Sequence, residues 1–381
     1  MKKIPPDRIR KIRIWTPGEG AAEIRSCDSN QDRLPLIDLA SNDYLGLSNH
    51  PKIIKAANNA ILNEGVGAGA SRFVTGTRSI HIMLEKELAS WLGQDKVFLF
   101  PSGFQANLAA VMALADRHTT IFVDKMIHYS LLVGIKASGA KLKRFSHNDL
   151  VDLETKLTLN PRGSAINSRL VITESLFSME GTSPNLKQIA DICEKHEAML
   201  LVDEAHALGV MGPAGKGLSN PLSKRVTMIT GTFGKAFGSG GAFVACNNEI
   251  GEHILQTSGA FRYTTALAPT LAAAALASLN LIQQNPNWGL FLQKQALYWR
   301  SKLASYGWIP PLGNGPILSL IVGSDKRALD YQNHLELSGL ATIAIRPPTV
   351  PEGTARLRVV LRRDLPKGTL MKLIHALEKK K

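Results

Sequence analysis

The sequence has few cysteines, no long apolar run and no export signal. Its three cysteines, Cys27, Cys193 and Cys246, lie far apart, and no pair has metal-ligand spacing. This excludes a disulfide framework and is typical of a reducing compartment. The longest weakly polar stretch, 267–282, is interrupted by polar residues and is shorter than the ~20 apolar residues that a membrane helix needs. Because the first fifteen residues also lack the apolar core of a signal peptide, we predict a cytoplasmic protein with no membrane partner.

Aromatic residues are scarce, at 6%, whereas basic residues are abundant. Lysine and arginine number 45 against 31 aspartates and glutamates, which gives a formal net charge of +14. An excess of this sign favours acidic partners such as nucleic acid, anionic lipid or a phosphorylated small molecule. The basic residues are mostly scattered, however, and no stretch interleaves them with aromatic residues. We interpret most of the charge as a solvated surface and expect no nucleic-acid partner.

The hydrophobic pattern indicates an α/β fold in a chain of 381 residues, which is long enough for two or three domains. Short apolar segments, typical of strands buried on both faces, alternate with helical patterns up to about residue 285. The predicted strands are 97–100, 120–123, 170–173, 199–203, 228–230 and 242–246, and the predicted helices include 51–63, 79–92 and 185–197. This alternation predicts a mostly parallel central sheet flanked by helices.

The pattern changes after about residue 285, which indicates a further domain. There we predict helices at 290–306 and 326–338, strands at 317–322, 343–345 and 355–361, and a final helix from Lys367. The first forty residues lack strong periodicity. The predicted organisation is therefore an N-terminal arm (1–40), a large domain (41–285) and a small C-terminal α+β domain (286–381).

An acidic residue ends the predicted strand in LLVDEAH (200–206). Ligands of open α/β sheets bind at the carboxyl ends of the strands, so Asp203 and His206 are candidate site residues. A magnesium-binding acid of a P-loop enzyme would need the phosphate loop G-x-x-x-x-G-K-[ST], which the sequence lacks. Asp203 as a structural helix cap remains the alternative.

A lysine lies among small residues in TGTFGKAFGSGG (230–241), between two predicted strands. Glycines allow a ligand to approach closely, and a lysine that attacks a carbonyl must first lose its proton, which desolvation and neighbouring cations favour. The alternative is a surface lysine on a flexible loop. Lys235 and Asp203 together fit pyridoxal phosphate (PLP), which needs a Schiff-base lysine, a carboxylate at its pyridine nitrogen and a phosphate site.

Further segments could complete such a site. In FLFPSGFQAN (98–107) a strand ends, Ser102 and Gly103 turn the chain and a helix begins, and a helix N-terminus can bind an anion; a plain strand–turn–helix corner is the alternative. The glycine-rich segment 65–76 lacks the strand and the acid of a dinucleotide site, so we interpret it as a substrate-lining loop. His128 and Ser178 each follow a predicted strand by a few residues, which makes them candidates for the same sheet edge.

Seven segments, in this order, resemble those of the α-oxoamine synthases. They are SNDYLGL (41–47), GAGASRFVTG (67–76), SGFQAN (102–107), ESLFSMEG (174–181), DEAH (203–206), TFGKAFGSGG (232–241) and RPPTVPEGTARLR (346–358). The resemblance extends from about residue 36 to 362. It implies a PLP-dependent transferase of fold type I, a homodimer with its active site at the subunit interface. Such enzymes condense an amino acid with an acyl thioester and release carbon dioxide.

The resemblance also implies roles for individual residues. The implied catalytic residues are Lys235, which forms the Schiff base, Asp203, which pairs with the pyridinium nitrogen, and His128, which stacks on the ring. The other implied cofactor-binding residues are Gly103, Phe104, Ser178, His206, Thr232 and, across the interface, Thr264 or Thr265. The implied substrate-binding residues are Asn42, His128, Thr349 and an N-terminal arginine, either Arg13 or Arg10. No metal is implied.

Two segments favour one branch of the family. RPPTVPEGTARLR resembles the branch that joins L-alanine to a pimeloyl thioester in biotin biosynthesis, and RFSHND (144–149) resembles that branch and the 5-aminolevulinate branch. The thioester carrier is either CoA or acyl carrier protein. The alternative is a sister enzyme that uses glycine with another acyl-CoA. Departures from the family pattern, such as Glu180 and Thr182, remove no implied cofactor contact but leave the acyl-chain specificity open.

Overall fold

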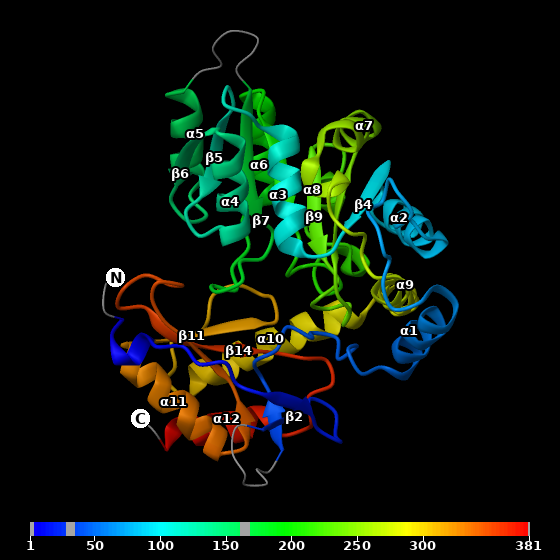
Figure 1. Cartoon of the computed structure of the whole chain (residues 1–381). Helices are drawn as coiled ribbons and strands as arrows, with labels where there is room; N and C mark the ends of the chain where they lie inside the picture. Colours follow the sequence, from blue (N-terminus) through cyan, green and yellow to red (C-terminus); the bar gives the residue numbers. More distant parts are fainter. Residues whose placement is uncertain (1–3, 28–34, 161–167, 380–381) are drawn as a thin grey trace. The chain divides into compact units, whose positions relative to one another are not determined.

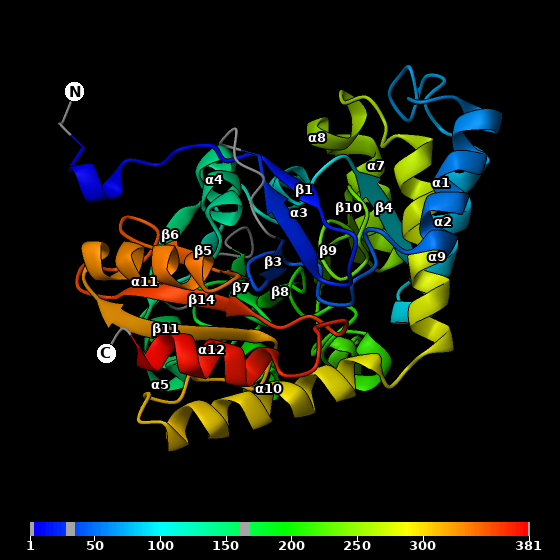
Figure 2. The same cartoon turned by 90° about the horizontal axis from the view of Figure 1, so that it is seen from below.

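The computed structural model describes residues 4–27, 35–160 and 168–379. The chain divides into two compact units, whose helices and strands are labelled in Figures 1 and 2. The larger unit contains Leu47–Phe177 and Ser183–Gly289, and the smaller unit contains the chain before Leu47, Ser178–Thr182 and the chain from Leu290 onward. The division into an arm and two domains at residues 40 and 285 stays a prediction. Over the described ranges, no helix is long and apolar enough to cross a membrane.

The larger unit is built on a seven-stranded sheet in the order β4-β10-β9-β8-β7-β5-β6. The strands are β4 (Lys96–Phe100), β5 (Thr120–Asp124), β6 (Lys141–Phe145), β7 (Arg169–Glu174), β8 (Met199–Asp203), β9 (Met228–Thr232) and β10 (Ala242–Cys246). β10 is antiparallel to both of its neighbours, and the other neighbouring pairs are parallel. Every residue of β7 and β10 is buried, as expected for a sheet covered on both faces. The six strands predicted in this region are confirmed.

Helices cover this sheet in groups (Figure 1). One group is α3 (Gly103–Leu114), α4 (Tyr129–Ser138), α7 (Asn248–Thr257) and α8 (Gly259–Arg262); α3 contacts the other three helices and strands β4, β9 and β10. Residues of these elements and of β5 form one hydrophobic cluster, which includes Phe98, Val111, Ile121, Leu131 and Val244. α5 (Leu150–Thr158) and α6 (Leu186–Lys195) contact each other and strands β5, β6 and β8. The third group is α1 (Pro51–Glu64), α2 (Ser79–Leu92) and α9 (Pro269–Gln284).

The smaller unit contains two sheets. β11 (Ile317–Gly323), β14 (Ala355–Val360) and β13 (Ile343–Ile345) are antiparallel in that order, and β1 (Trp15–Pro17), β2 (Glu23–Ser26), β3 (Leu36–Asp38) and β12 (Leu340–Ala341) form the second sheet. Its helices are α11 (Asp325–Leu337), α12 (Thr369–Glu378), the short η1 (Pro6–Arg8) and most of α10 (Trp288–Ser305). Strands β1 to β3 lie in the segment whose weak periodicity predicted none.

A buried histidine joins two segments of the larger unit. His81 on α2 is 0% exposed; its Nε2 lies 2.7 Å from the carbonyl oxygen of Leu267, and its Nδ1 accepts a hydrogen bond from the Arg78 N–H at 3.0 Å. One ring nitrogen therefore donates and the other accepts, which is the pattern of a neutral imidazole. Burial, assisted by the charges of Arg72 and Arg78, lowers the pKa of His81 to about 4.

We expect this histidine to make the fold less stable at acidic pH. Below its ordinary pKa of 6.5, His81 of the unfolded chain binds a proton, whereas the folded chain keeps it neutral until about pH 4. The contribution of the neutral His81 to the free energy of unfolding is therefore complete above pH 6.5. It is lost as the pH falls, and the free energy of unfolding is lower by about 2–3 kcal/mol near pH 4.5. The free energy of unfolding is measured with urea above pH 6.5 and near pH 4.5, for the wild type and for His81→Gln. The decrease between the two pH values should be smaller in the variant by this amount. The exposed His118→Gln is the matched control, and equal pH dependence in both variants would contradict the assignment.

Candidate active site

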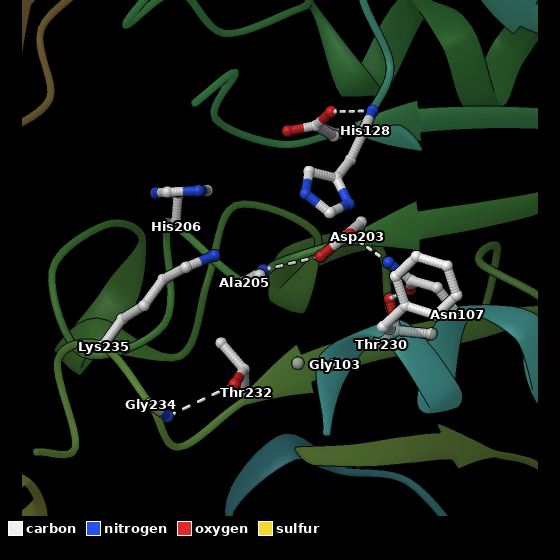
Figure 3. Close-up of a pocket in the computed structure, with 13 residues that line it drawn as sticks. Gly103, Asn107, His128, Asp203, Ala205, His206, Thr230, Thr232, Gly234 and Lys235 are labelled. Atoms are coloured by element: carbon white, nitrogen blue, oxygen red, sulfur yellow. Dashed lines mark hydrogen bonds between the residues drawn. The ribbon is translucent and has the colours of Figure 1, made fainter. Parts of the chain in front are cut away.

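A pocket of about 230 Å³ lies at the carboxyl ends of the parallel strands of the large sheet (Figure 3). All of its lining residues belong to the larger unit. They are Gly103, Phe104, Asn107, His128, Glu174, Asp203, Ala205, His206, Thr230, Gly231, Thr232, Gly234 and Lys235. The structure thus brings together seven of the residues that the sequence analysis singled out: Gly103, Phe104, His128, Asp203, His206, Thr232 and Lys235.

Asp203 is the last residue of β8 and is only 5% exposed. One of its carboxylate oxygens accepts a hydrogen bond from Asn107 Nδ2 at 2.8 Å, and the other accepts one from the Ala205 N–H at 2.9 Å (Figure 3). Both partners are hydrogen-bond donors, one on each carboxylate oxygen. They fix the orientation of the Asp203 side chain, whose oxygens can still accept a bond from a ligand.

Lys235 lies in the tight loop between β9 and β10. The Gly238 N–H donates to the Lys235 carbonyl oxygen at 2.9 Å, and the Phe233 N–H donates to the Gly241 carbonyl oxygen at 2.9 Å. Gly238 has φ +60°, and a Cβ there would lie 2.3 Å from the Ser48 backbone nitrogen, so a larger residue at this point would displace the loop. The Lys235 side chain extends from this loop toward His206 and Ala205 (Figure 3).

An anion site lies on another side of the pocket. Gly103 and Phe104 are the first two residues of α3, whose N-terminal N–H groups have no partners within the helix. Thr232 faces this helix end, because a Cβ on Gly103 would lie 3.8 Å from Thr232 Oγ1. The Thr232 hydroxyl donates to the Gly241 carbonyl oxygen at 3.0 Å and accepts from the Gly234 N–H at 3.2 Å. The backbone N–H groups are donors that suit a phosphate, and the Thr232 hydroxyl could join them by turning its hydrogen away from Gly241.

His128 caps α4 and lines the same pocket. Its backbone N–H donates to Glu174 Oε1 at 2.6 Å, and its Nδ1 lies 2.7 Å from Ser130 Oγ. The ring is open to the pocket on one side, but the protein that packs around its other sides lowers the pKa of His128; the charge of Lys235 lowers it further, and Asp203 opposes the shift. We therefore describe His128 as a neutral imidazole at neutral pH.

Comparison with known proteins identifies the family. The model of the family "Aminotransferase class I and II" matches residues 35–377. The chain belongs to this family. A relative within it, the 8-amino-7-oxononanoate synthase of Saccharophagus degradans, is 40% identical over 345 residues, which cover 90% of this chain and 86% of the relative.

Solved structures show the same fold. The 8-amino-7-oxononanoate synthase of Francisella tularensis aligns with a TM-score of 0.76 and 29% identity over 91% of this chain and 96% of that one. The serine palmitoyltransferase of Sphingomonas wittichii aligns with a TM-score of 0.90 and 26% identity over 97% and 91%. The predicted resemblance, fold type I architecture and cofactor are confirmed: this aminotransferase-family chain is a PLP-dependent enzyme of the 8-amino-7-oxononanoate synthase group.

The pocket residues fit each functional part of PLP. Lys235 can bind the aldehyde, the Asp203 carboxylate suits the pyridine nitrogen, and the N-terminus of α3 with Thr232 suits the phosphate. His206, only 6% exposed, lines the pocket next to the tip of Lys235 in Figure 3. These roles remain proposals, but the donors and the acceptor are of the right kind for this member of the family.

The remaining predicted residues do not line this pocket. Thr264 and Thr265 lie in the larger unit, where Thr265 forms an isolated β-bridge with Ser71; their contact across a dimer interface stays a prediction. Asn42, Ser178, Thr349, Arg10 and Arg13 belong to the smaller unit. There, Arg10 Nη2 donates to Thr349 Oγ1 at 2.7 Å, whereas Arg13 pairs with Glu336 at 2.5 Å. Of the two arginines, Arg10 is thus the one that contacts a predicted substrate residue.

Sequence reasoning missed two polar residues with contacts to predicted ones. Arg358, only 4% exposed, donates to the Ser178 carbonyl oxygen at 2.7 Å and to Asn42 Oδ1 at 2.8 Å. In the part of the chain that the structure describes, no carboxylate pairs with it. Asn107, at 4% exposed, bonds Asp203. Both residues end segments that carried the family resemblance, SGFQAN and RPPTVPEGTARLR, and this membership was the available signal.

Proposed function

We propose that this enzyme joins L-alanine to a pimeloyl thioester and forms 8-amino-7-oxononanoate, carbon dioxide and the free thiol carrier. The observation that carries the proposal is a PLP-type pocket with Lys235 and Asp203 in a chain that is 36–40% identical to proteins named 8-amino-7-oxononanoate synthase. We further propose that it acts in the cytoplasm, as a homodimer, in biotin biosynthesis. The thioester carrier, CoA or acyl carrier protein, is a polyanion in either case, which suits a chain of net charge +14.

The chain's own residues divide the chemical work. When bound, PLP supplies an electron sink for the substrate Cα. The Asp203 carboxylate would keep a proton on the pyridine nitrogen, and the α3 N-terminus with Thr232 would hold the phosphate. Lys235 would bind the aldehyde, and its Nζ would accept the Cα proton of alanine. His206 is proposed to hydrogen-bond the phenolic oxygen of the ring, and His128 to stack on its face.

The bond changes in the substrates balance without an external redox partner. The alanine Cα forms a bond to the thioester carbonyl carbon, and the carbon–sulfur bond breaks so that the thiol leaves. The bond from Cα to the carboxylate then breaks, carbon dioxide leaves and Cα takes up a proton. Both substrates carry a carboxylate, for which the N-terminal arginine, Arg13 or Arg10, is the proposed cation.

A substrate panel tests this proposal. The purified enzyme is incubated with pimeloyl-CoA and L-alanine, glycine or L-serine, and with acetyl-CoA in place of pimeloyl-CoA, and the products are measured by mass spectrometry. We expect the highest kcat/KM with L-alanine and pimeloyl-CoA. A higher value with glycine and acetyl-CoA would instead support the sister reaction that the sequence left as the alternative.

A further inference from the structure

A network of hydrogen-bonded polar side chains connects two residues of the pocket, Asp203 and His128. Asn107 Nδ2 donates to Asp203 Oδ2 at 2.8 Å and to Ser130 Oγ at 2.9 Å. Thr230 Oγ1 donates to Asn107 Oδ1 at 2.7 Å, and Ser130 Oγ lies 2.7 Å from His128 Nδ1. Asn107, Ser130 and Thr230 are 4%, 0% and 1% exposed. Figure 3 shows Asn107 and Thr230 beside Asp203, with His128 on its other side.

The donors and acceptors in this network fit in one arrangement. If the Asn107 amide were flipped, its oxygen would face the Asp203 carboxylate, and two acceptors would then meet. The amide nitrogen therefore faces this side, with one hydrogen toward Asp203 and the other toward Ser130. The Ser130 hydroxyl accepts one of them and has its own hydrogen left for His128 Nδ1. The backbone N–H of Ser130 also points at Nδ1, at 3.3 Å. Nδ1 is thus an acceptor for two donors, and the neutral ring carries its hydrogen on Nε2.

We propose that Asn107 is a positioning residue that orients Asp203 and His128 together, so that His128 serves as a hydrogen-bond donor through Nε2. Asp203 is held at both carboxylate oxygens, by Asn107 and by the Ala205 N–H, and cannot turn away from a ligand. His128 is held through Ser130. Outer partners of this kind commonly set the activity of the groups that touch the ligand. The inference rests on the proposed use of this pocket for PLP and alanine.

Four variants and one control test this network of side chains. Asn107→Leu removes all its polar contacts at similar volume, Ser130→Ala removes the bond toward His128, and Thr230→Val removes the bond that orients the amide; the double variant combines the first two. The measurements are kcat and KM for L-alanine and the affinity of the apoprotein for PLP, followed by absorbance. Gln105→Leu is the matched control, because it removes an amide on the same helix whose side chain bonds the Ala260 carbonyl oxygen at 2.8 Å.

We expect Asn107→Leu to lower kcat about 10–100-fold and PLP affinity about 10-fold, with a much smaller change in KM for L-alanine. Ser130→Ala should lower kcat by a smaller factor and leave PLP affinity close to that of the wild type, because the bond to Asp203 remains. In the double variant the two reductions in kcat should not multiply, because Asn107→Leu alone already interrupts the hydrogen-bond network. Gln105→Leu should keep wild-type kcat and PLP affinity.

Several results would overturn the inference. If the reductions in kcat of Asn107→Leu and Ser130→Ala multiplied fully in the double variant, the two residues would act independently. Wild-type kcat in a folded Asn107→Leu protein would mean that the network does not contribute to catalysis. If Asn107→Leu does not fold, the other two single variants decide. Wild-type kcat and PLP affinity in both Ser130→Ala and Thr230→Val would also mean that the network does not contribute to catalysis. A wild-type protein that binds PLP but does not use L-alanine would instead contradict the proposed substrate and leave the PLP-affinity arm of this test intact.

Discussion

Turnover is expected to fall by at least about 10³-fold when Lys235 is replaced with alanine. The pocket has one lysine among its lining residues, and in our proposal this group both binds the cofactor and accepts the substrate proton. The fold should survive, because the loop is held by backbone hydrogen bonds such as that from the Phe233 N–H to the Gly241 carbonyl oxygen. Single-turnover and steady-state assays with L-alanine and pimeloyl-CoA measure the effect.

The matched control for this variant is Lys224→Ala, which removes an exposed lysine of the same unit outside the pocket. It should keep wild-type turnover. A folded Lys235→Ala protein that retained a tenth or more of wild-type turnover would show that another group does this chemistry, and the assignment of the pocket would have to be withdrawn.

Asp203→Asn is expected to lower kcat by about 10²–10³-fold, the usual cost of losing one well-placed electrostatic contact in an active site. The substitution removes the negative charge but keeps the shape, and the amide oxygen can still accept from Asn107. The loss should therefore appear mainly in kcat, with the unfolding midpoint of the apoprotein little changed. A lower kcat that was matched by a comparable loss of folded protein would point to a structural role instead.

The exposed Asp95→Asn serves as the control for that experiment, since it also removes one carboxylate from the larger unit. We expect no change in kcat there. The absorption spectrum of bound PLP adds a second readout, because the protonation of the pyridine nitrogen depends on the neighbouring carboxylate. An unchanged spectrum and unchanged kcat in Asp203→Asn would contradict its proposed contact with this nitrogen.

Much of the fold could be predicted because its strands are buried on both faces. Segments such as 242–246 are continuous apolar runs, and the predicted and observed strand β10 have the same bounds. β6 was missed for the opposite reason: four of its five residues, KLKRF, are exposed, and it pairs with one neighbour at the edge of the sheet. Charged residues are common on such edges, and they remove the hydrophobic pattern that predicts a strand.

The site could be predicted only as far as its residues carry unusual local signals. Asp203 at a strand end and Lys235 among glycines are visible in the sequence, and the family resemblance added the rest of the cofactor set. Asn107 and Arg358 gave no such signal, because their contacts to Asp203, Asn42 and Ser178 join segments far apart in the chain. Whether a buried polar residue serves a site depends on which group it bonds, and only the three-dimensional arrangement shows this.

The central claim is that Lys235 holds PLP covalently, and one measurement tests it directly. The purified protein is saturated with PLP, reduced with borohydride, digested and mapped by mass spectrometry, with Lys235→Ala treated in parallel. We predict a single pyridoxyl phosphate adduct, on the peptide that carries Lys235, and none at any site in the variant. An adduct on a different lysine, or a wild-type protein that takes up no cofactor, would contradict the account.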